Sequence, residues 1–275
     1  MNTFGPLPLD VVSIMSQVVY GHVGNSIAVP RLCRAGLHVA AVPTVVLSNT
    51  PHYPTVHGGA LPLDWFQDYL DDLLARDALY RLRAVVVGFL GNAAQAQALG
   101  RWLDRIRPNY PDLLLIVDTV IGDHDHGIYV DPSLVDAYRD LLIGKARGLT
   151  PNGFELAQLT GLPVDGIDDT IRAARQLLAG NTEWVVVTSA APATWTPDDM
   201  KILVVTRTDA TTIVHPRLAL TPKGTGDLFT ASLAAHLLEG APIETAARRS
   251  ADDVLAALRE TQRAQCAELL LPPRP

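Results

Sequence analysis

Leu220-Thr-Pro-Lys-Gly-Thr-Gly-Asp-Leu-Phe-Thr-Ala-Ser-Leu-Ala-Ala-His-Leu-Leu-Glu-Gly240 combines a glycine turn with a periodic apolar segment. Phe229, Leu233 and Leu237 recur every four residues, which predicts a helix that ends at Gly240. The glycines at its start let the backbone turn sharply and bring its N–H groups close to a ligand. Because the helix dipole points to the same place, this segment is typical of an anion-binding site.

Asp227 lies in the first turn of this predicted helix, where the dipole favours the ionised carboxylate. Beside a bound phosphate, such a carboxylate can accept a proton from an alcohol that attacks the phosphorus. Lys223, next to the glycines, can neutralise phosphate charge. Taken alone, both residues have a plainer interpretation, as an ordinary first-turn acid and a solvated lysine.

Composition limits the class of protein. The chain has 275 residues, of which 48% are hydrophobic, enough for a large core. A net charge of −7 without a block of Lys or Arg argues against a nucleic-acid partner. Cys33 and Cys266 lie far apart and predict neither a disulfide framework nor a CxxC metal site. Met1–Leu9 lacks the pattern of a signal peptide, and no apolar run is long enough to span a membrane. We therefore expect a cytoplasmic protein without a membrane partner.

Apolar runs alternate with amphipathic ones, which predicts a single α/β domain over residues 1–275, with a mostly parallel central β-sheet and helices on both faces. The predicted strands are Val11–Met15, Val39–Leu47, Ala84–Gly88, Leu113–Asp118, Trp184–Thr188 and a hairpin of Lys201–Thr206 with Thr211–His215. The predicted helices include Pro62–Arg76, Ala93–Arg107, Pro132–Ile143, Asp168–Ala179 and a last one from about Ile243 to Leu270. Ser16–Asn25 follows the first strand and leads into a helix that runs to about Ala35, whereas Ser48–Leu61 and Asp118–Gly127 are interpreted as loops.

Polar residues follow most of these strands, and in parallel sheets ligands bind at the carboxyl ends of the strands. They are Ser16, Ser48, Asn49, Asp118, Asp123, Thr150, Asn152, Glu155, Thr188 and Asp227. Asp118 and Asp123 are suited to Mg²⁺ beside a nucleotide, although Asp123 fits an exposed loop acid equally well. Asn152 and Glu155 fit a helix capping pair as well as a site that orders water around a metal. Thr188 can reach a phosphate or ribose, or can simply end a strand. His52 is the better loop-histidine candidate because polar residues surround it.

Several motifs together resemble the pyridoxal kinases of the ribokinase-like superfamily. In chain order they are Ser16-Gln-Val-Val-Tyr-Gly-His-Val-Gly-Asn25, Val46-Leu-Ser-Asn49, Asp118-Thr-Val-Ile-Gly-Asp123, Thr150-Pro-Asn-Gly-Phe-Glu155 and Gly224-Thr-Gly-Asp227. They cover nearly the whole chain. The resemblance implies a ribokinase-like fold and ATP-dependent phosphorylation of the 5′-hydroxymethyl group of pyridoxal, pyridoxine or pyridoxamine. It also implies Mg²⁺, with a monovalent cation as a further option, and a homodimer.

The resemblance also assigns roles to residues. Asp227 would be the base, and the N–H groups of Gly224, Thr225 and Gly226 would form the anion hole with it. The substrate-binding set would be Ser16, Val23, His52, Tyr53, Phe89 and Asp227. The ATP-binding set would be Asp118, Thr150, Asn152, Glu155, Thr188, Lys223 and Gly226. Asp118, Asp123 and Glu155 would serve the metal, and His124–Tyr129 would form a flap over the phosphates.

The chain departs from the family pattern around the substrate. Thr50-Pro51 replaces the usual His-Thr before His52-Tyr53, Phe89 replaces a tyrosine, and Thr119 replaces a proline. Val117 stands where some members have a cysteine. These changes bear on the preferred vitamer more than on phosphoryl transfer. Two alternatives remain at this point: a hydroxymethylpyrimidine kinase, and a catalytically silent vitamer-binding protein.

Overall fold

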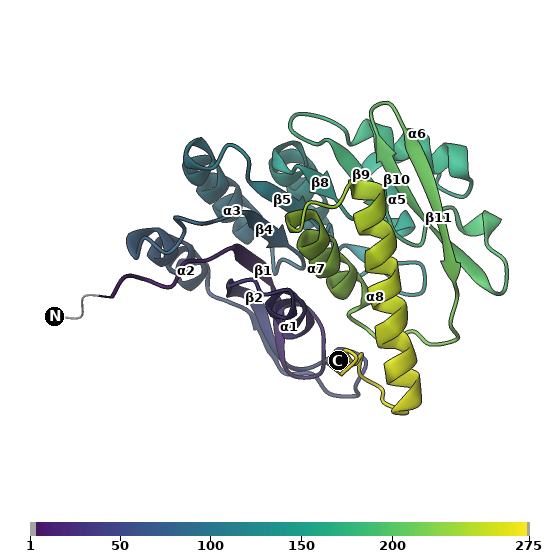
Figure 1. The fold of residues 1–275 in the computed structure, drawn as a ribbon, viewed down its shortest axis with the longest axis horizontal. Coiled ribbons are helices and arrows are strands. Elements are labelled where there is room, and N and C mark those ends of the chain that lie inside the picture. The colour runs from purple at the N-terminus through teal and green to yellow at the C-terminus, as the bar shows by residue number, and fades with distance from the viewer. Residues whose placement is uncertain (1–3, 274–275) are drawn as a thin grey trace.

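A nine-stranded sheet forms the centre of the protein in the computed structural model, which describes residues 4–273. The strand order is β11-β10-β9-β8-β5-β4-β1-β2-β3, and helices pack on both sides of this sheet as one domain (Figure 1). A separate two-stranded hairpin joins β6 to β7. The predicted fold class is therefore confirmed. The predicted domain limits, 1 and 275, lie outside the described residues.

The strands are β1 (Val11–Tyr20), β2 (Val39–Asn49), β3 (Gly58–Ala60), β4 (Ala84–Val87), β5 (Leu114–Val117), β6 (Gly122–Asp123), β7 (Gly127–Ile128), β8 (Gly148–Leu149), β9 (Trp184–Val187), β10 (Asp199–Thr206) and β11 (Ala210–Pro216). The α-helices are α1 (Asn25–Arg34), α2 (Leu63–Ala75), α3 (Ala93–Ile106), α4 (Pro132–Ala137), α5 (Gly153–Thr160), α6 (Ile167–Gln176), α7 (Thr225–Leu238) and α8 (Ile243–Arg263). Short helical turns are η1 (Arg107–Asn109), η2 (Tyr138–Leu142), η3 (Ile143–Lys145) and η4 (Pro192–Thr194).

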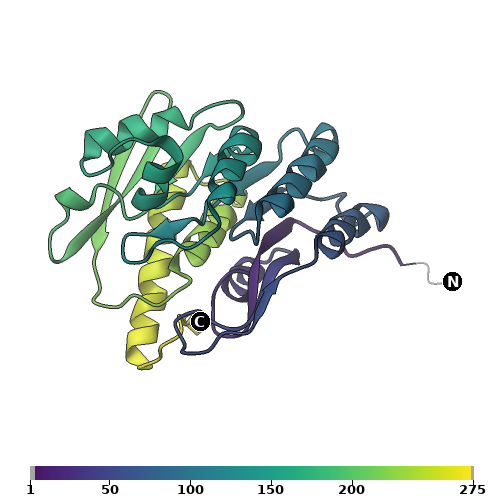
Figure 2. The same cartoon turned by 180° about the vertical axis from the view of Figure 1, so that it is seen from behind.

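The central strands are parallel from β9 across to β2, and antiparallel strands complete both edges. Every residue of β4, β5 and β9 is buried, which explains why these strands are continuous apolar runs. Helices α1, α7 and α8 cover the face seen in Figure 1, whereas α2 to α6 cover the face seen from behind in Figure 2. Each face has its own apolar cluster against the sheet.

Helix α7 is buried along most of its length, and its residues from Leu228 to Ala235 are all buried. The small side chains among them let the helix lie close to the sheet and to its neighbours α1 and α8. A helix that is buried on all sides packs against its neighbours around its whole circumference, and not along one apolar stripe alone. Its first turn, which carries Asp227, is therefore fixed by the core of the protein.

The polar segments interpreted as loops contain more structure than expected. Ser16–Tyr20 continues β1, because its backbone pairs with β2 after a bulge between Met15 and Gln17. The loop after β2 contains the edge strand β3, and the loop after β5 contains the β6–β7 hairpin. The prediction that Ser48–Leu61 and Asp118–Gly127 are loops is wrong where these short strands form, and the predicted first strand, ending at Met15, is too short.

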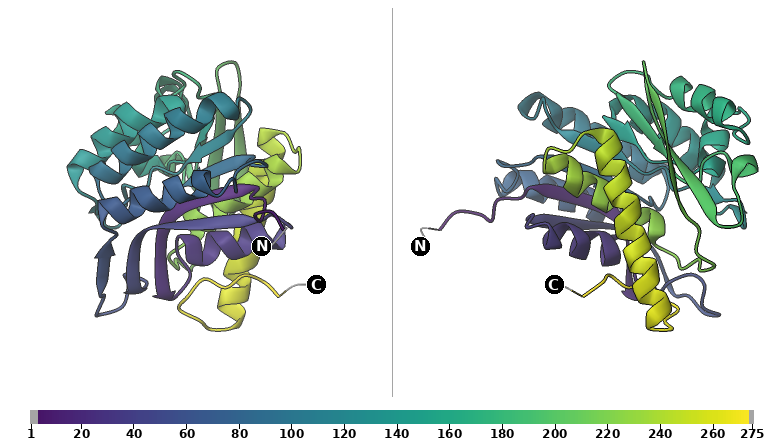
Figure 3. Two further views of the ribbon diagram at one scale, coloured as in Figure 1. Left: turned by 90° about the vertical axis from the view of Figure 1, so that its left-hand side faces the viewer. Right: turned by 45° about the vertical axis from the view of Figure 1, so that its right-hand side comes forward.

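Two predicted helices end earlier than expected. Pro132–Ile143 divides into α4 and the turns η2 and η3. Helix α8 ends at Arg263 instead of Leu270, and Gln265 then adopts a positive φ of 50°. The chain turns back there, and its last described residues lie beside α1 and the carboxyl ends of β1 and β2 (Figures 1 and 3). No helix within residues 4–273 is long and apolar enough to cross a membrane.

Candidate active site

The predicted site residues gather at the carboxyl edge of the parallel strands. Asp118 directly follows β5, Thr150 follows β8 and Thr188 follows β9. Thr188 is tied to the chain after β8, because its N–H donates to the carbonyl of Pro151 at 3.0 Å. The turn before α7 reaches the same edge, since a side chain placed at Gly226 would lie 3.8 Å from Asp118 Oδ2. The expected convergence at this edge is therefore present.

Gly224 forms the bend that starts α7. Its φ of 95° lies in the left-handed region, which a residue with a Cβ adopts only with strain. A Cβ at this position would lie 2.1 Å from the carbonyl oxygen of His22, in the turn between β1 and α1. The position therefore requires glycine for two reasons. The bend leaves the N–H groups of Thr225, Gly226 and Asp227 at a helix N-terminus, where an anion binds favourably.

Asp227 faces the turn between β1 and α1. The N–H of Gly24 donates a hydrogen bond of 2.8 Å to Asp227 Oδ2. The residue keeps some exposed surface, yet burial of its carboxyl raises the pKa to about 6, against the lowering effect of the Gly24 bond. The group is thus ionised near neutral pH and basic enough to accept a proton. These are the properties required of a general base.

Asp118 lies deeper, with 6% of its surface exposed. Thr230, from the first turns of α7, donates to Asp118 Oδ2 at 3.2 Å, and Thr230 Oγ1 lies 2.9 Å from Thr150 Oγ1. Burial, followed by the charges of Glu155 and Asp227, raises the pKa of Asp118 well above its usual range. Two neighbouring carboxyl groups therefore repel Asp118, and positive charge beside it would relieve that repulsion.

Glu155 and Asn152 form a capping box at the start of α5. Asn152 Oδ1 accepts from the Glu155 N–H at 2.9 Å, and Glu155 Oε2 accepts from the Asn152 N–H at 2.8 Å. The other oxygen, Oε1, accepts from the N–H of Ile121 at 3.0 Å. Burial raises the pKa of Glu155 although these backbone donors lower it. The capping interpretation of this pair is confirmed, and its role toward a metal stays a prediction.

The β6–β7 hairpin lies next to these groups. Asn152 Nδ2 donates to the carbonyl of Gly122 at 2.8 Å, which ties α5 to the hairpin. Asp123 Oδ1 accepts from the N–H of His126 at 2.8 Å, and Oδ2 lies 3.4 Å from Lys223 Nζ. Burial opposes ionisation of Asp123, but the hydrogen bonds from His126 and the charge of Lys223 lower its pKa. The hairpin is therefore linked by an ion pair to the turn before α7.

The metal set predicted from sequence does not form one cluster. Within residues 4–273, no three His, Cys, Asp or Glu side chains come together closely enough to hold a metal ion. Glu155 and Asp123 accept hydrogen bonds from backbone N–H groups, whereas Asp118 accepts one from the Thr230 hydroxyl. A single carboxylate is a usual protein contribution to Mg²⁺ bound with nucleotide phosphates.

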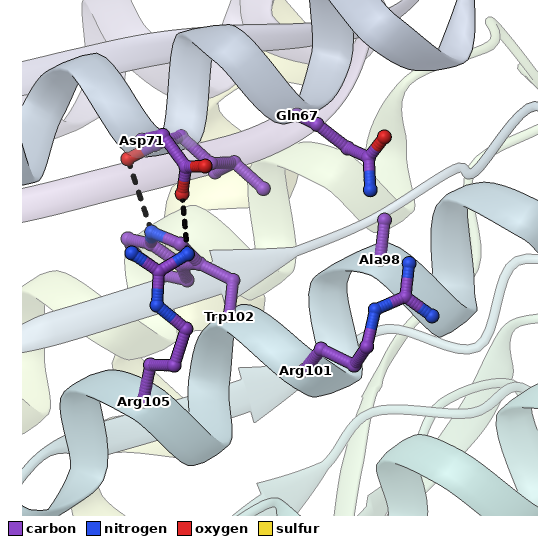
Figure 4. A pocket seen from close by; sticks show the side chains of 7 residues that line it. Gln67, Asp71, Ala98, Arg101, Trp102 and Arg105 are labelled. Atoms are coloured by element: carbon purple, nitrogen blue, oxygen red, sulfur yellow. Dashed lines mark hydrogen bonds and ion pairs between the residues drawn. The ribbon is translucent and has the colours of Figure 1, made fainter.

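Two concave regions of the surface lie away from this edge. A cavity of about 60 Å³ lies between α2 and α3, where Arg105 pairs with Asp71 and Trp102 donates to the carbonyl of Leu70 (Figure 4). A groove of about 720 Å³ runs along the starts of β4, β5 and β9 and the end of α7. Neither region is lined by a predicted site residue.

Most of the predicted substrate residues lie on the turns after β1, β2 and β4, whereas Ser16 lies within β1 and Asp227 at the start of α7. Ser16 is at the bulge of β1, and a Cβ at Gly24 would lie 2.6 Å from its hydroxyl oxygen. Val23 lies in the same β1–α1 turn as Gly24. The rings of His52 and Tyr53 lie 4.1 Å apart in the loop after β2. Phe89 follows β4, and its carbonyl accepts a hydrogen bond of 2.6 Å from Thr44.

Glu268 is a residue that the sequence interpretation missed. It lies in the segment that turns back after α8, and its carboxylate reaches the loops after β1 and β2. A predicted helix running to Leu270 placed it far from the site. Thr119 was noted only as a departure, yet its buried hydroxyl has no hydrogen-bond partner among the described residues.

Comparison with known proteins agrees with this geometry. Residues 35–269 match the model of a family described as phosphomethylpyrimidine kinase. The chain is 60% identical to a pyridoxine/pyridoxal/pyridoxamine kinase of Bordetella bronchiseptica over 270 residues, which cover 98% of this chain and 95% of the relative. The chain belongs to the pyridoxal kinase family. Among solved pyridoxal kinases, that of Entamoeba histolytica has a TM-score of 0.88 at 27% identity, covering 96% of this chain and 92% of the other.

A pyridoxal kinase of Leishmania donovani, solved in complex with ADP and pyridoxine, has a TM-score of 0.87 at 30% identity. The alignment covers 95% of this chain and 90% of that structure. In this member of the pyridoxal kinase family, the departures from the family pattern have structural consequences. Thr50 is fully buried and donates to Glu268, and Thr119 is fully buried beside Asp118. Both hydroxyl groups therefore lie inside the protein.

Proposed function

We propose that the protein transfers the γ-phosphoryl group of ATP to the 5′-hydroxymethyl group of a vitamin B6 vitamer: pyridoxal, pyridoxine or pyridoxamine. The observation that carries this proposal is the bend at Gly224, which places a helix N-terminus and the carboxylate of Asp227 side by side. Phosphoryl transfer to an alcohol needs an anion site for the transferred group and, beside it, a base for the hydroxyl proton. Membership of the pyridoxal kinase family supports this class of substrate.

In the proposed mechanism, the vitamer lies between the turns after β1, β2 and β4, with its hydroxymethyl group toward Asp227. Ser16, Val23, His52, Tyr53 and Phe89 bind the ring. Asp227 accepts the hydroxyl proton as the oxygen attacks the γ-phosphorus, and the Gly24 N–H keeps the carboxylate in place. The N–H groups of Gly224, Thr225 and Gly226 stabilise the charge that develops on the transferred group.

ATP lies across the carboxyl ends of β5, β8 and β9 in this proposal. Thr150, Asn152, Thr188 and Lys223 line its path, and Lys223 reaches the hairpin through Asp123. Asp118 would hold Mg²⁺ directly, and Asp123 and Glu155 would act on its water shell. Burial and the charges of Glu155 and Asp227 disfavour an ionised Asp118, and a hard cation beside it would offset both effects. When bound, Mg²⁺ supplies positive charge to the nucleotide phosphates. A further monovalent cation at this acidic edge is an option within the proposal.

The proposal includes a homodimer in the cytoplasm. Val19 and Val46 are exposed and share one face of the β1–β2 pair, because Gln17 pairs with Val46. Exposed apolar side chains of this kind on a sheet surface support self-association. Both cysteines are free, which supports a reducing compartment. Light scattering coupled to gel filtration would test the dimer, and a single-chain mass at micromolar concentration would reject it.

The test of the function is an assay of ADP release with each of the three vitamers and with hydroxymethylpyrimidine, the substrate of the alternative function. The description of the matching family keeps that alternative under test. We expect vitamers to be phosphorylated with a higher kcat/KM than hydroxymethylpyrimidine, and Asp227→Asn to slow both reactions roughly 10²–10⁴-fold. Preference for hydroxymethylpyrimidine would favour the alternative kinase, and vitamer binding without ADP release would favour a silent binding protein.

A further inference from the structure

The carboxylate of Glu268 occupies an unusual position for a residue near the end of the chain. Only 4% of its surface is exposed. Its Oε2 atom accepts two hydrogen bonds, from the N–H of His22 at 3.1 Å and from Thr50 Oγ1 at 2.9 Å. Its Oε1 atom is buried without a hydrogen-bond partner and lies 3.6 Å from His52 Nε2. One side chain thus contacts the turn after β1 and the loop after β2.

The segment that carries Glu268 is firmly attached. Leu269 is fully buried with Ile27 of α1, Leu228 of α7 and Ala257 of α8. The N–H of Leu270 donates to Thr261 Oγ1 at 2.8 Å, which holds the returning chain against α8. Because Leu228 follows Asp227 directly, the same small cluster supports the first turn of α7. The position of the Glu268 carboxylate is therefore set by packing and not by a flexible tail.

The surroundings of this carboxylate are closely packed. A Cβ at Gly21 would lie 1.9 Å from Thr50 Oγ1 and 2.5 Å from Glu268 Oε2, so the turn after β1 approaches the loop as closely as glycine allows. The aromatic ring of Tyr53 lies next to His52, and burial together with the nearby Glu268 carboxylate raises the pKa of the Tyr53 hydroxyl. A buried carboxylate is unfavourable unless its oxygens are paired, so the unpaired Oε1 has a reason to hold His52.

We propose that Glu268 is a positioning residue that sets the affinity for the vitamer by holding His52 at the substrate site. This inference rests on the proposed function, in which His52 binds the vitamer ring. The two oxygens have separate tasks. Oε2 fixes the distance between the β1 turn and the β2 loop, and Oε1 orients the imidazole of His52. The departure at Thr50-Pro51 is then compensated from the C-terminal segment, because Thr50 becomes the partner of Glu268 instead of facing the substrate.

Glu268→Gln separates these tasks. The amide oxygen can still accept from His22 and Thr50 at the place of Oε2, while the NH₂ group replaces the oxygen that faces His52. We expect the KM for pyridoxal to rise about three- to tenfold, with the KM for ATP unchanged and the melting temperature close to that of the wild type. In a His52→Ala background the same substitution should have no further effect on the KM for pyridoxal.

Two other variants complete the experiment. Glu260→Gln is the matched control, because Glu260 is a carboxylate of α8 that pairs with Arg263 and lies outside the site. It should leave both KM values unchanged. Thr50→Val removes the hydroxyl donor to Oε2 with little change in shape, and it should also weaken pyridoxal selectively. It keeps the test valid if Glu268→Gln proves unstable.

Three results would overturn the inference: an unchanged KM for pyridoxal in Glu268→Gln and Thr50→Val, an equal rise of the KM for ATP, or an undiminished effect of Glu268→Gln in the His52→Ala background. Each would mean that the carboxylate only supports the fold. The wild-type assay distinguishes this failure from a failure of the proposed function. A wild-type protein that does not phosphorylate pyridoxal rejects the function itself, whereas an active wild type with insensitive variants rejects only the role of Glu268.

Discussion

The pH dependence of turnover follows from the environment of Asp227. Its pKa is raised to about 6 by burial, so the carboxyl is about 97% ionised near pH 7.5 and only about 10% ionised near pH 5. A base must be ionised to accept the substrate proton. The value of kcat/KM should therefore fall about tenfold per pH unit below about pH 6. An enzyme whose catalytic aspartate had the ordinary pKa would keep most of its activity at about pH 5.

The assay measures ADP by chromatography, which avoids coupling enzymes with pH limits of their own. The pH profiles of kcat/KM for pyridoxal and pyridoxine are compared, because a fall in acid that both substrates share belongs to the enzyme. Asp227→Asn should lower kcat by roughly 10²–10⁴-fold, and the residual activity should no longer fall in acid. An activity that stays level from about pH 7.5 down to about pH 5, or a variant with near-normal turnover, would refute the assignment of the base.

The same raised pKa has a consequence for stability. The folded protein binds a proton at Asp227 more tightly than the unfolded chain does, so this contribution to stability is fully present below about pH 4 and is lost as the pH rises through about 6. Asparagine can still accept from Gly24 and carries no charge. Asp227→Asn should therefore raise the free energy of unfolding near pH 7.5, by at most about 3 kcal/mol, and lose that advantage in acid. Urea unfolding of both proteins at about pH 7.5 and at about pH 4 measures this difference in the free energy of unfolding.

Three further predictions concern the anion turn, the substrate loop and the metal. Gly224→Ala should destabilise the protein by about 1–3 kcal/mol and raise the KM for ATP, because it combines a left-handed φ with a close approach to His22; unchanged unfolding by urea would contradict this. His52→Ala should raise the KM for pyridoxal more than that for ATP, and an equal rise in both would show that His52 only supports loop folding. Chelation of Mg²⁺ should stop turnover, and Asp118→Asn should raise the Mg²⁺ concentration for half-maximal rate roughly tenfold; an unchanged requirement would remove Asp118 from the metal site.

The parts of the fold that could be predicted are those with strong local signals. Ala84–Val87 and Trp184–Val187 are buried on both faces, so their apolar runs are unbroken and easily interpreted as strands. The glycine bend before α7 and the four-residue apolar period within this helix predict the position of Asp227. The strand-end polar residues converge because parallel strands must end at one edge, whatever their order in the sheet.

The missed features depend on contacts that no local pattern records. The predicted first strand stops at Met15, whereas β1 continues to Tyr20 because the segment after the bulge pairs with β2. Helix α8 ends at Arg263 without glycine or proline, and Gln265 then adopts a left-handed conformation that is rare for such a residue. Glu268 was therefore placed in a helix, and its contacts across 218 and 246 residues of sequence to Thr50 and His22 stayed hidden.

The central claim is that the bend at Gly224 holds the phosphoryl group that Asp227 helps to transfer. The most direct measurement is a crystal structure of the protein with a non-hydrolysable ATP analogue and pyridoxine. The account predicts the γ-phosphate within hydrogen-bonding distance of the N–H groups of Gly224–Asp227, with the vitamer hydroxymethyl oxygen next to the Asp227 carboxylate. A γ-phosphate bound away from that bend, or a hydroxymethyl group out of reach of Asp227, would contradict it.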